Sequence, residues 1–275
     1  MGKGFVFETD RRITCAAEEL LREGNEVVRL TAPEDAALLR NPGDADFVIL
    51  PIRGTADGTI PVPGGVIRAD DFLQTLPEKT VVISGISTPY EESLRCRYFN
   101  FQKDPDYVRK NSQYTAEGVL LLLLSETPAS IFSYSYDLLG DGNTGRAIAP
   151  LLRRLGLSFR WITAEGGEGK KQLSLWQRHV PADVIINTIP APVILASQFE
   201  NFVPDGSRED GAEGKIYIFD ISSGGKGMAD EDKHLPCVVY KNTPPLPGLA
   251  APASAGHLMV ELLRKLMAEN GSRQD

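Results

Sequence analysis

Three glycines with the spacing G-x-G-x-x-G, Gly140, Gly142 and Gly145, are the residues of this chain that point most directly to chemistry. In turns that bind dinucleotides, the first glycine permits a tight bend after a strand, and the second lets a pyrophosphate approach the backbone. The third lets the following helix pack closely, and the N–H groups at the start of that helix, here near Asn143 and Thr144, attract the phosphates. The spacing therefore predicts a phosphate-binding turn formed by these five residues.

The segments on either side of the glycines fit the strands and the helix that such a turn requires. Apolar residues recur at helical spacing over residues 148–155, and residues 157–162 form a candidate next strand. Two acidic residues disagree with the pattern, because Asp137 falls in the expected apolar strand and Asp141 in the turn itself. An unpaired carboxylate is costly in a buried strand. The alternative is therefore a unit that has kept this fold but lost tight nucleotide binding.

Two later apolar segments have the length of buried strands and end in polar residues. The first ends in Asn187 and Thr188, and the second in Asp220 and Ser222. Ligands of open parallel sheets bind at the carboxyl ends of the strands. We therefore predict that these four residues line a bound dinucleotide. Capping of the turns that follow the strands is the alternative role.

The N-terminal part of the chain has the same alternation of strands and helices, and no hairpin turn is evident. Candidate strands lie at residues 4–7, 26–30, 46–51 and 80–87. This pattern predicts an open parallel α/β sheet with its ligands at the carboxyl ends of the strands. Those ends are residues 8–12, 51–59 and 84–87.

The composition favours a cytoplasmic protein that binds neither nucleic acid nor membranes. The 275-residue chain carries a formal net charge of −8, which disfavours nucleic-acid and anionic-membrane partners. Cys15, Cys96 and Cys237 are odd in number and far apart, so we expect reduced thiols rather than disulfides. The sequence shows no signal-like N-terminus, no apolar run long enough for a bilayer and no cluster of metal ligands.

Motifs spread over nearly the whole chain form a combination that is more specific than any one of them. They are Leu50-Pro51, residues 83–87, Asn111-Ser112 with Glu117-Gly118, and residues 140–145, 186–190, 219–225, 246–248 and 252–256. Together they resemble the family of the A subunit of dipicolinate synthase, the NAD(P)-dependent oxidoreductase of spore-forming bacteria. Its fold is similar to that of the D-2-hydroxyacid and alanine dehydrogenases.

The resemblance implies an α/β protein with two open parallel-sheet domains and an active site in the cleft between them. The N-terminal domain would be a flavodoxin-like substrate domain, and the C-terminal domain a Rossmann domain that binds the cofactor. For this chain we expect these domains at residues 1–112 and 130–253, with a linking helix at 113–129. The final helix, residues 254–270, is expected to pack back on the first domain.

The activity that the resemblance implies is oxidation of a dihydrodipicolinate-type cyclic dicarboxylate to dipicolinate, with hydride transfer to NAD or NADP. The product gains aromaticity, so the protein has mainly to align the reacting C–H with the nicotinamide and to remove a proton. A flavoprotein-like B subunit is the implied partner, and a homo-oligomer is expected.

Several positions depart from the family pattern. Thr163 stands where NAD-specific proteins carry an acid for the ribose, and Ala164 where the family commonly has an Arg that suits a 2′-phosphate. Gln113-Tyr114 and Ala253 replace a Pro and a Lys that are usual in the family. These departures leave the choice between NAD and NADP open. They also leave two alternative functions open. The first is a non-catalytic partner or regulatory subunit, and the second is a dehydrogenase of another small carboxylate.

Six polar residues are predicted to bind the dicarboxylate: Arg12, Arg53, Ser84, Ser87, Asn111 and Ser112. The two arginines follow strand ends and could bind carboxylates with two parallel hydrogen bonds, although surface arginines would look the same. The two serines flank Gly85 in a loop whose backbone could bind an anion, and turn formation is their alternative role.

The catalytic base is not specified by the sequence. His257, in the last helix, and Glu117, near the start of the expected linking helix, are the candidates. An ordinary role in a helix is the alternative for both residues. For Glu117 the reason is that a carboxylate is favoured near the start of a helix. No carboxylate stands at a spacing from His179 or His234 that would indicate a catalytic pair, so we expect both histidines to lie on the surface.

Overall fold

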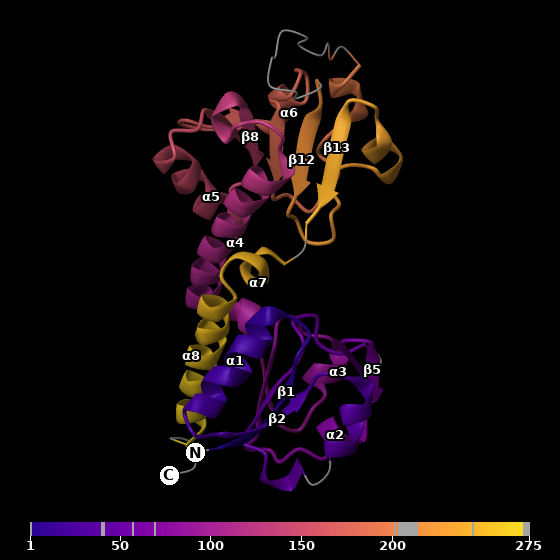
Figure 1. The fold of residues 1–275 in the computed structure, drawn as a ribbon, viewed down its shortest axis with the longest axis vertical. Helices are drawn as coiled ribbons and strands as arrows, with labels where there is room; N and C mark the ends of the chain where they lie inside the picture. Colours follow the sequence, from indigo (N-terminus) through magenta and orange to yellow (C-terminus); the bar gives the residue numbers. More distant parts are fainter. Residues whose placement is uncertain are drawn as a thin grey trace. The chain divides into compact units, whose positions relative to one another are not determined.

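The computed structural model describes residues 2–271 except 40–41, 57, 69, 201, 203–213 and 244. The chain forms two compact units, one made of Met1–Asn111 and Pro247–Asp275 and the other of Ser112–Leu246. Each unit contains its own parallel β-sheet with helices on its faces (Figure 1). The predicted fold class, two open parallel-sheet α/β domains, is thereby confirmed.

The sheet of the first unit has five parallel strands in the order β2-β1-β3-β6-β7. The strands are β1 (Lys3–Phe7), β2 (Glu26–Leu30), β3 (Phe47–Ile49), β6 (Val81–Ser84) and β7 (Arg97–Asn100). This is the flavodoxin-like order, in which the direction of winding reverses between β1 and β3 and ligands bind beside that point. All three residues of β3 and all four of β6 are buried, as expected for strands covered on both faces.

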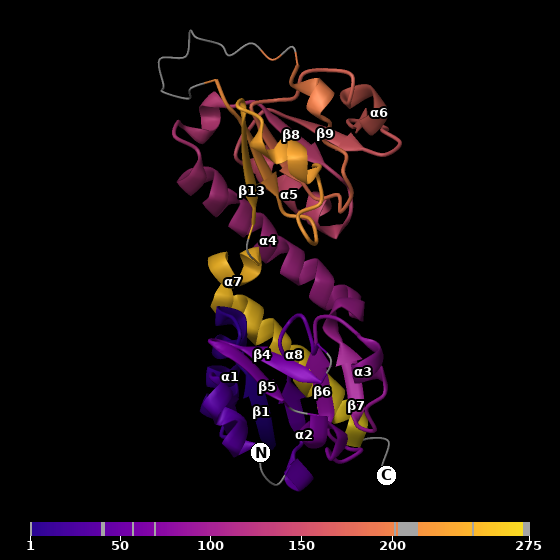
Figure 2. The ribbon, with the colours of Figure 1, turned by 90° about the vertical axis from the view of Figure 1, so that its right-hand side faces the viewer.

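Two long helices, α1 (Arg11–Arg22) and α8 (Pro252–Gly271), lie side by side on one face of this sheet (Figures 1 and 2). Asp10 caps α1, because its side chain accepts a hydrogen bond from the backbone N–H of Arg12. Gly256 permits the close approach of α8, since a Cβ there would lie 2.6 Å from the carbonyl oxygen of Arg12. The C-terminal helix therefore belongs to the first unit.

A two-stranded antiparallel hairpin lies on the opposite face of the first sheet, so the expectation of no hairpin in this half was wrong. Its strands are β4 (Thr59–Val62) and β5 (Gly65–Arg68). Pro63 and Gly64 make the turn, and Gly64 adopts a φ of +82°. The remaining short elements are α2 (Asp70–Gln74), α3 (Pro89–Glu92), η1 (Pro33–Leu38), η2 (Pro42–Asp44) and η3 (Phe101–Lys103).

The sheet of the second unit has six parallel strands in the order β10-β9-β8-β11-β12-β13. The strands are β8 (Tyr136–Leu139), β9 (Phe159–Thr163), β10 (Lys171–Gln172), β11 (Val184–Asn187), β12 (Ile216–Asp220) and β13 (Val238–Asn242). This is the Rossmann order 3-2-1-4-5-6, whose winding reverses between β8 and β11.

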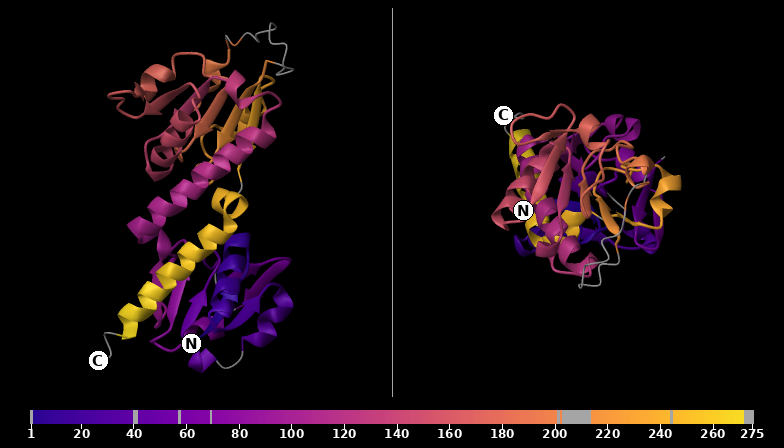
Figure 3. Two further views of the ribbon diagram at one scale, coloured as in Figure 1. Left: turned by 60° about the vertical axis from the view of Figure 1, so that its left-hand side comes forward. Right: turned by 90° about the horizontal axis from the view of Figure 1, so that it is seen from above.

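Helices cover the second sheet on both faces. α4 (Pro105–Glu126) and α5 (Asn143–Arg154) pack on one face of the sheet (Figure 3). Val119 of α4 and Leu152 of α5 belong there to the same buried cluster as Leu138 of β8. α6 (Leu173–Trp176) packs on the other, where Trp176 meets Leu139. The division between the two units falls inside α4, which begins eight residues before the expected linking helix. The other short helices are α7 (Leu246–Ala250), η4 (Ile131–Ser133), η5 (Ala196–Gln198) and η6 (Asp230–His234).

Candidate functional site

The three glycines of the G-x-G-x-x-G turn have different surroundings. Gly140 follows β8 with a φ of +99°, and a Cβ there would clash with the Thr188 hydroxyl. A Cβ on Gly145 would clash with the carbonyl oxygen of Gly140, so the third glycine permits close packing of α5. Gly142, in contrast, has no atom within 4 Å of its would-be Cβ. The space above the second glycine is therefore open, as a pyrophosphate would need.

The N-terminus of α5 is suited to bind an anion. Gly142 is the N-cap, and no side chain caps this end of the helix. The backbone N–H of Arg146 makes the first intrahelical hydrogen bond, to the carbonyl oxygen of Gly142 at 2.9 Å. The N–H groups of the first turn, at Asn143 and Thr144, therefore remain directed out of the helix end. Asn143 is also exposed to solvent.

Asp137, the first acidic residue that disagreed with the pattern, does not reach this space. Its fully buried carboxylate accepts two hydrogen bonds from Arg160 on β9, both at 2.6 Å. It accepts two more from the indole N–H of Trp176 and the backbone N–H of Ala182. These four bonds satisfy the charge on the α6 side of the sheet, so Asp137 is a structural residue.

Asp141 is paired with two cations. The Nζ atom of Lys170 lies 3.0 Å from its Oδ2 atom, and the Nη2 atom of Arg146 lies 3.7 Å from it. The hydrogen bond from Lys170 is the main cause that lowers the pKa of Asp141 below its ordinary value. The acidic residue of the turn is therefore neutralised by residues that the sequence pattern did not connect to it.

A buried polar network ties together the ends of β11, β12 and β13. Asp220 accepts hydrogen bonds from Asn187, from both the N–H and the hydroxyl of Ser222, from the N–H of Gly227 and from the hydroxyl of Tyr240. Burial, followed by the bond to Asp220, raises the pKa of Tyr240 well above its ordinary value. Asn187 and Asp220 thus shape the edge of the site by their hydrogen bonds to neighbouring loops.

Thr188 and Thr163 also make local hydrogen bonds. The Thr188 hydroxyl donates to the carbonyl oxygen of Leu139, directly before the glycine turn. The Thr163 hydroxyl accepts a hydrogen bond from the N–H of Gly166 and is buried. Thr163 therefore does not supply the acid that binds the ribose in NAD-specific proteins. Glu165, two residues later, is exposed.

Arg12 and Arg53 follow the two strands that flank the reversal point of the first sheet, but their surroundings differ. Arg12 is buried, and its Nε and Nη2 atoms both bond to the carboxylate of Asp10, at 3.1 and 2.6 Å. Its guanidinium is therefore largely occupied. Arg53 is exposed in the loop after β3 and is the better placed of the two for an external carboxylate.

The loops after β3 and β6 are joined by Glu91, which the sequence motifs did not single out. The buried carboxylate of Glu91 accepts hydrogen bonds from the N–H and hydroxyl groups of both Thr55 and Thr88. A Thr-x-x-Glu capping box at residues 88–91 was the available signal. Glu91 thus holds the loop of Arg53 against the loop of Ser87.

The two predicted serines are placed differently. The fully buried Ser84 bonds to the Tyr98 hydroxyl and to the carbonyl oxygen of Ile86, so it is a turn-forming residue in this structure. Ser87 is half-buried, accepts a hydrogen bond from Asn100 and lines a pocket of about 360 Å³. Of the two, Ser87 is the one available to a ligand.

The other predicted residues lie on the long helices. Asn111 and Ser112 lie in α4 at the division between the units, and Glu117 is exposed on the same helix. His257 on α8 bonds through Nδ1 to Glu19 of α1 at 2.8 Å, and its Nε2 lies 3.7 Å from Glu261. The imidazole therefore takes part in the contact between α1 and α8.

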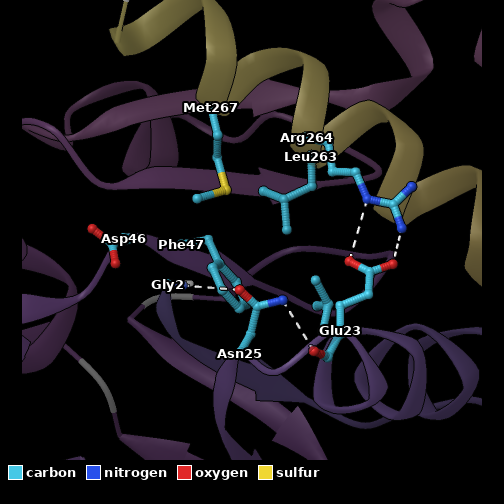
Figure 4. Close-up of a pocket in the computed structure, with 9 residues that line it drawn as sticks. Gly2, Glu23, Asn25, Asp46, Phe47, Leu263, Arg264 and Met267 are labelled. Atoms are coloured by element: carbon cyan, nitrogen blue, oxygen red, sulfur yellow. Dashed lines mark hydrogen bonds and ion pairs between the residues drawn. The ribbon is translucent and has the colours of Figure 1, made fainter.

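Two further pockets lie in different units, one beside the loop after β9 and the other at the amino ends of strands. One of about 480 Å³, in the second unit, borders the loop after β9 and is lined by Arg160, Lys170 and Trp176. The other, of about 500 Å³, lies in the first unit at the amino ends of β1 and β3, between Phe47 and Met267 (Figure 4). Ligands of open parallel sheets bind at the carboxyl ends, so only the first of these pockets suits the predicted chemistry.

Comparison with known proteins agrees with this geometry. No protein-family model matches the chain. The A subunit of dipicolinate synthase from Bacillus subtilis is 27% identical over 243 residues, which cover 82% of this chain and 78% of that protein. The chain resembles the A subunit of dipicolinate synthase. The resemblance inferred from the motifs is thus confirmed.

Solved structures share the fold over nearly the whole chain. The A subunit of dipicolinate synthase from Bacillus halodurans superimposes with a TM-score of 0.78 at 22% identity, covering 97% of this chain and 98% of the other. A Polaromonas protein described as a D-isomer specific, NAD-binding 2-hydroxyacid dehydrogenase gives a TM-score of 0.61 at 14% identity, covering 100% and 97%. The chain therefore shares its fold with these proteins.

Two kinds of feature are absent from the part of the chain that the structure describes. None of its helices is both long and apolar enough to cross a membrane. No group of three or more His, Cys, Asp or Glu residues within it could hold a metal ion.

Proposed function

We propose that this protein is an oxidoreductase that binds a nicotinamide dinucleotide, NADP or NAD, in its second unit. The observation that supports the proposal most directly is the open space above Gly142, beside an uncapped helix N-terminus. Gly140, Gly142, Asn143, Thr144 and Gly145 would hold the pyrophosphate. The loops that Thr188, Asn187, Asp220 and Ser222 shape would border the nicotinamide end, and Thr163 the ribose at the other end.

The proposed substrate is a dihydrodipicolinate-type cyclic dicarboxylate, as the resemblance to the A subunit of dipicolinate synthase suggests. When bound, the nicotinamide would accept a hydride, and the substrate ring would lose a proton as it becomes aromatic. Arg53 would bind a carboxylate with its planar guanidinium, and Ser87 would donate a hydrogen bond. Arg12, Ser84, Asn111 and Ser112 would support these groups, and His257 and Glu117 stay the candidates for the proton acceptor.

Cofactor titration of a Gly142→Val variant tests this function. Gly142 has a φ of −66° and open space around its would-be Cβ, so valine fits the fold and costs only about 1 kcal/mol at an N-cap. Its side chain would instead fill the place of the pyrophosphate. We expect the wild-type protein to bind NADPH or NADH in calorimetric titration and the variant to lose that binding at least 100-fold.

Gly43→Val is the matched control, because Gly43 also has no atom within 4 Å of its would-be Cβ and lies in the first unit. It should bind the cofactor as the wild type does. Undiminished cofactor binding by a folded Gly142→Val variant would refute the placement of the pyrophosphate. No binding of any of the four nicotinamide dinucleotides to the wild-type protein at millimolar concentration would refute the function.

The second candidate function is a non-catalytic partner subunit, and the internal hydrogen bonds of Asn187, Asp220 and Thr163 favour it. The Bacillus subtilis relative is named as one subunit of a synthase. We propose a flavoprotein-like B subunit as the partner of this chain, and self-association as a homo-oligomer. Sedimentation of the chain alone and with a candidate B subunit would measure both.

A further inference from the structure

The loop between β9 and β10, residues 164–170, is unusually short for a connection between neighbouring parallel strands. It is also rich in glycine. Gly166, Gly167 and Gly169 have φ angles of +77°, +130° and +67°, which let the chain turn back over a few residues. The loop therefore returns its last residue, Lys170, to the glycine turn at the carboxyl end of β8.

The contacts of Lys170 fix the position of its ammonium group. The Nζ atom lies 3.0 Å from Oδ2 of Asp141, inside the glycine turn, and 4.5 Å from the centroid of the Trp161 ring on β9. The indole N–H of Trp161 in turn donates to the carbonyl oxygen of Gly140 at 2.9 Å. The ammonium group thus lies at the side of the turn that faces β9.

The charges around the turn leave a positive surplus. Asp141 is one carboxylate between two cations, Lys170 and Arg146. If Lys170 bonded to another anion, Asp141 would keep Arg146 as its partner. The adjoining pocket of about 480 Å³ adds Lys171 and is also lined by Glu165. A phosphate group beside this turn would therefore meet a net positive site in a protein of formal net charge −8.

The ribose of the adenosine lies at the end of the second strand in Rossmann domains. There an acid binds the 2′-hydroxyl of NAD, or a nearby cation binds the 2′-phosphate of NADP. Here Thr163 turns its hydroxyl into its own loop and Ala164 carries no charge. Lys170, at the far end of the loop, lines the same pocket as Glu165 and Gly166.

We propose that Lys170 selects a 2′-phosphorylated nicotinamide dinucleotide, by donating a hydrogen bond to the 2′-phosphate. The inference rests on the function proposed above, because it concerns the same cofactor site. Lys170 would be a specificity residue, and it would leave the binding of the pyrophosphate at Gly142 unchanged.

Calorimetric titration of the full-length protein with NADPH, NADH, adenosine 2′,5′-bisphosphate and AMP tests the proposal. We expect NADPH to bind more tightly than NADH, and the bisphosphate more tightly than AMP. Lys170→Ala should weaken NADPH and the bisphosphate about 10- to 100-fold, the value of one charge-assisted hydrogen bond, and NADH and AMP less than threefold. Lys170→Arg should retain most of the preference.

Lys241→Ala is the matched control. Lys241 is an exposed lysine of the same unit that pairs with Glu126 at 2.9 Å, so the variant removes an equal charge elsewhere. It should bind all four ligands as the wild type does. Circular dichroism of each variant shows whether it is folded.

The outcomes separate the two proposals. Equal affinities for NADPH and NADH in the wild type, or equal weakening of both in Lys170→Ala, would overturn the role of Lys170 and leave the proposed oxidoreductase intact. Failure of the wild type to bind any of the four ligands would overturn the cofactor site and the role of Lys170 together.

Discussion

Glu91 is the side chain on which the shape of the proposed substrate edge most depends. Its carboxylate is fully buried and accepts four hydrogen bonds, two from Thr55 in the loop after β3 and two from Thr88 in the loop after β6. Gly54 lies so close that a Cβ there would be 2.5 Å from Oε1 of Glu91. The two loops are thus held together by one carboxylate.

Replacing Glu91 by Gln keeps the size of the side chain and removes one acceptor. Both Thr55 and Thr88 present a backbone N–H to the carboxylate, at 2.6 and 2.7 Å, and a backbone N–H cannot reverse its role. One of them must then face the NH₂ group of Gln. A buried donor left without an acceptor costs about 1–3 kcal/mol, so we expect that loss of stability in Glu91→Gln.

Amide hydrogen exchange measures this loss where it occurs, since two units need not unfold together. Protection of the Thr55 and Thr88 amides should fall about 5- to 150-fold in Glu91→Gln, which corresponds to about 1–3 kcal/mol. Glu92→Gln is the control, because Glu92 is the exposed neighbour on the same helix and should change stability by less than about 0.5 kcal/mol. Equal protection in the two variants would show that Glu91 does not hold the loops.

Three further results are expected. Asp137→Ala should destabilise the second unit by about 3–5 kcal/mol in thermal unfolding, because it leaves the guanidinium of Arg160 without its buried partner. Burial raises the pKa of Cys96 to about 11, so at pH 8 only about one thiol in a thousand is ionised, and a thiol reagent should modify it quickly only after denaturation. Lys170 lowers the pKa of Asp141 below 3.8, so their ion pair is complete above that pH and is lost as the pH falls through the lowered value. The ammonium group of Lys170 lies 4.5 Å from the centroid of the Trp161 ring, so we expect the fluorescence emission of Trp161 to change only below about pH 4, where the ion pair is lost. Asp141→Asn should remove this transition while the circular dichroism spectrum stays unchanged.

Much of the fold could be predicted from local pattern because parallel strands covered on both faces consist of continuous apolar runs. The glycine turn could be predicted because Gly140, Gly142 and Gly145 stand at a fixed spacing that the sequence shows directly. The hairpin of β4 and β5 was missed although Pro63 and Gly64 mark its turn. Its alternation of apolar and polar residues is weak in the sequence, because the apolar Val66 is exposed directly before the buried Ile67.

The site could be predicted only in part because its charges are decided by contacts between distant segments. Arg12 and Arg53 occupy equivalent places after strands, yet Asp10 occupies the guanidinium of the first, whereas the second is exposed. Glu91 has a local signal as a capping residue, but its bonds to Thr55 span 36 residues of chain. Such pairings depend on strand order, which hydrophobic periodicity does not specify.

The two acidic residues that argued against a nucleotide site show the same limit. Asp137 is satisfied by Arg160 across the sheet, and Asp141 by Lys170 from the next loop, so neither opposes a phosphate once its partners are counted. Within the nucleotide site, Thr163 and Ala164 at the ribose end remain as departures from the pattern of the A subunit of dipicolinate synthase, and the role proposed for Lys170 would give them a physical reason. The two variants separate these parts of the site. Gly142→Val should abolish binding of NADPH and NADH alike, whereas Lys170→Ala should weaken NADPH alone, because one blocks the phosphate that both cofactors share and the other removes a contact to the phosphate that distinguishes them.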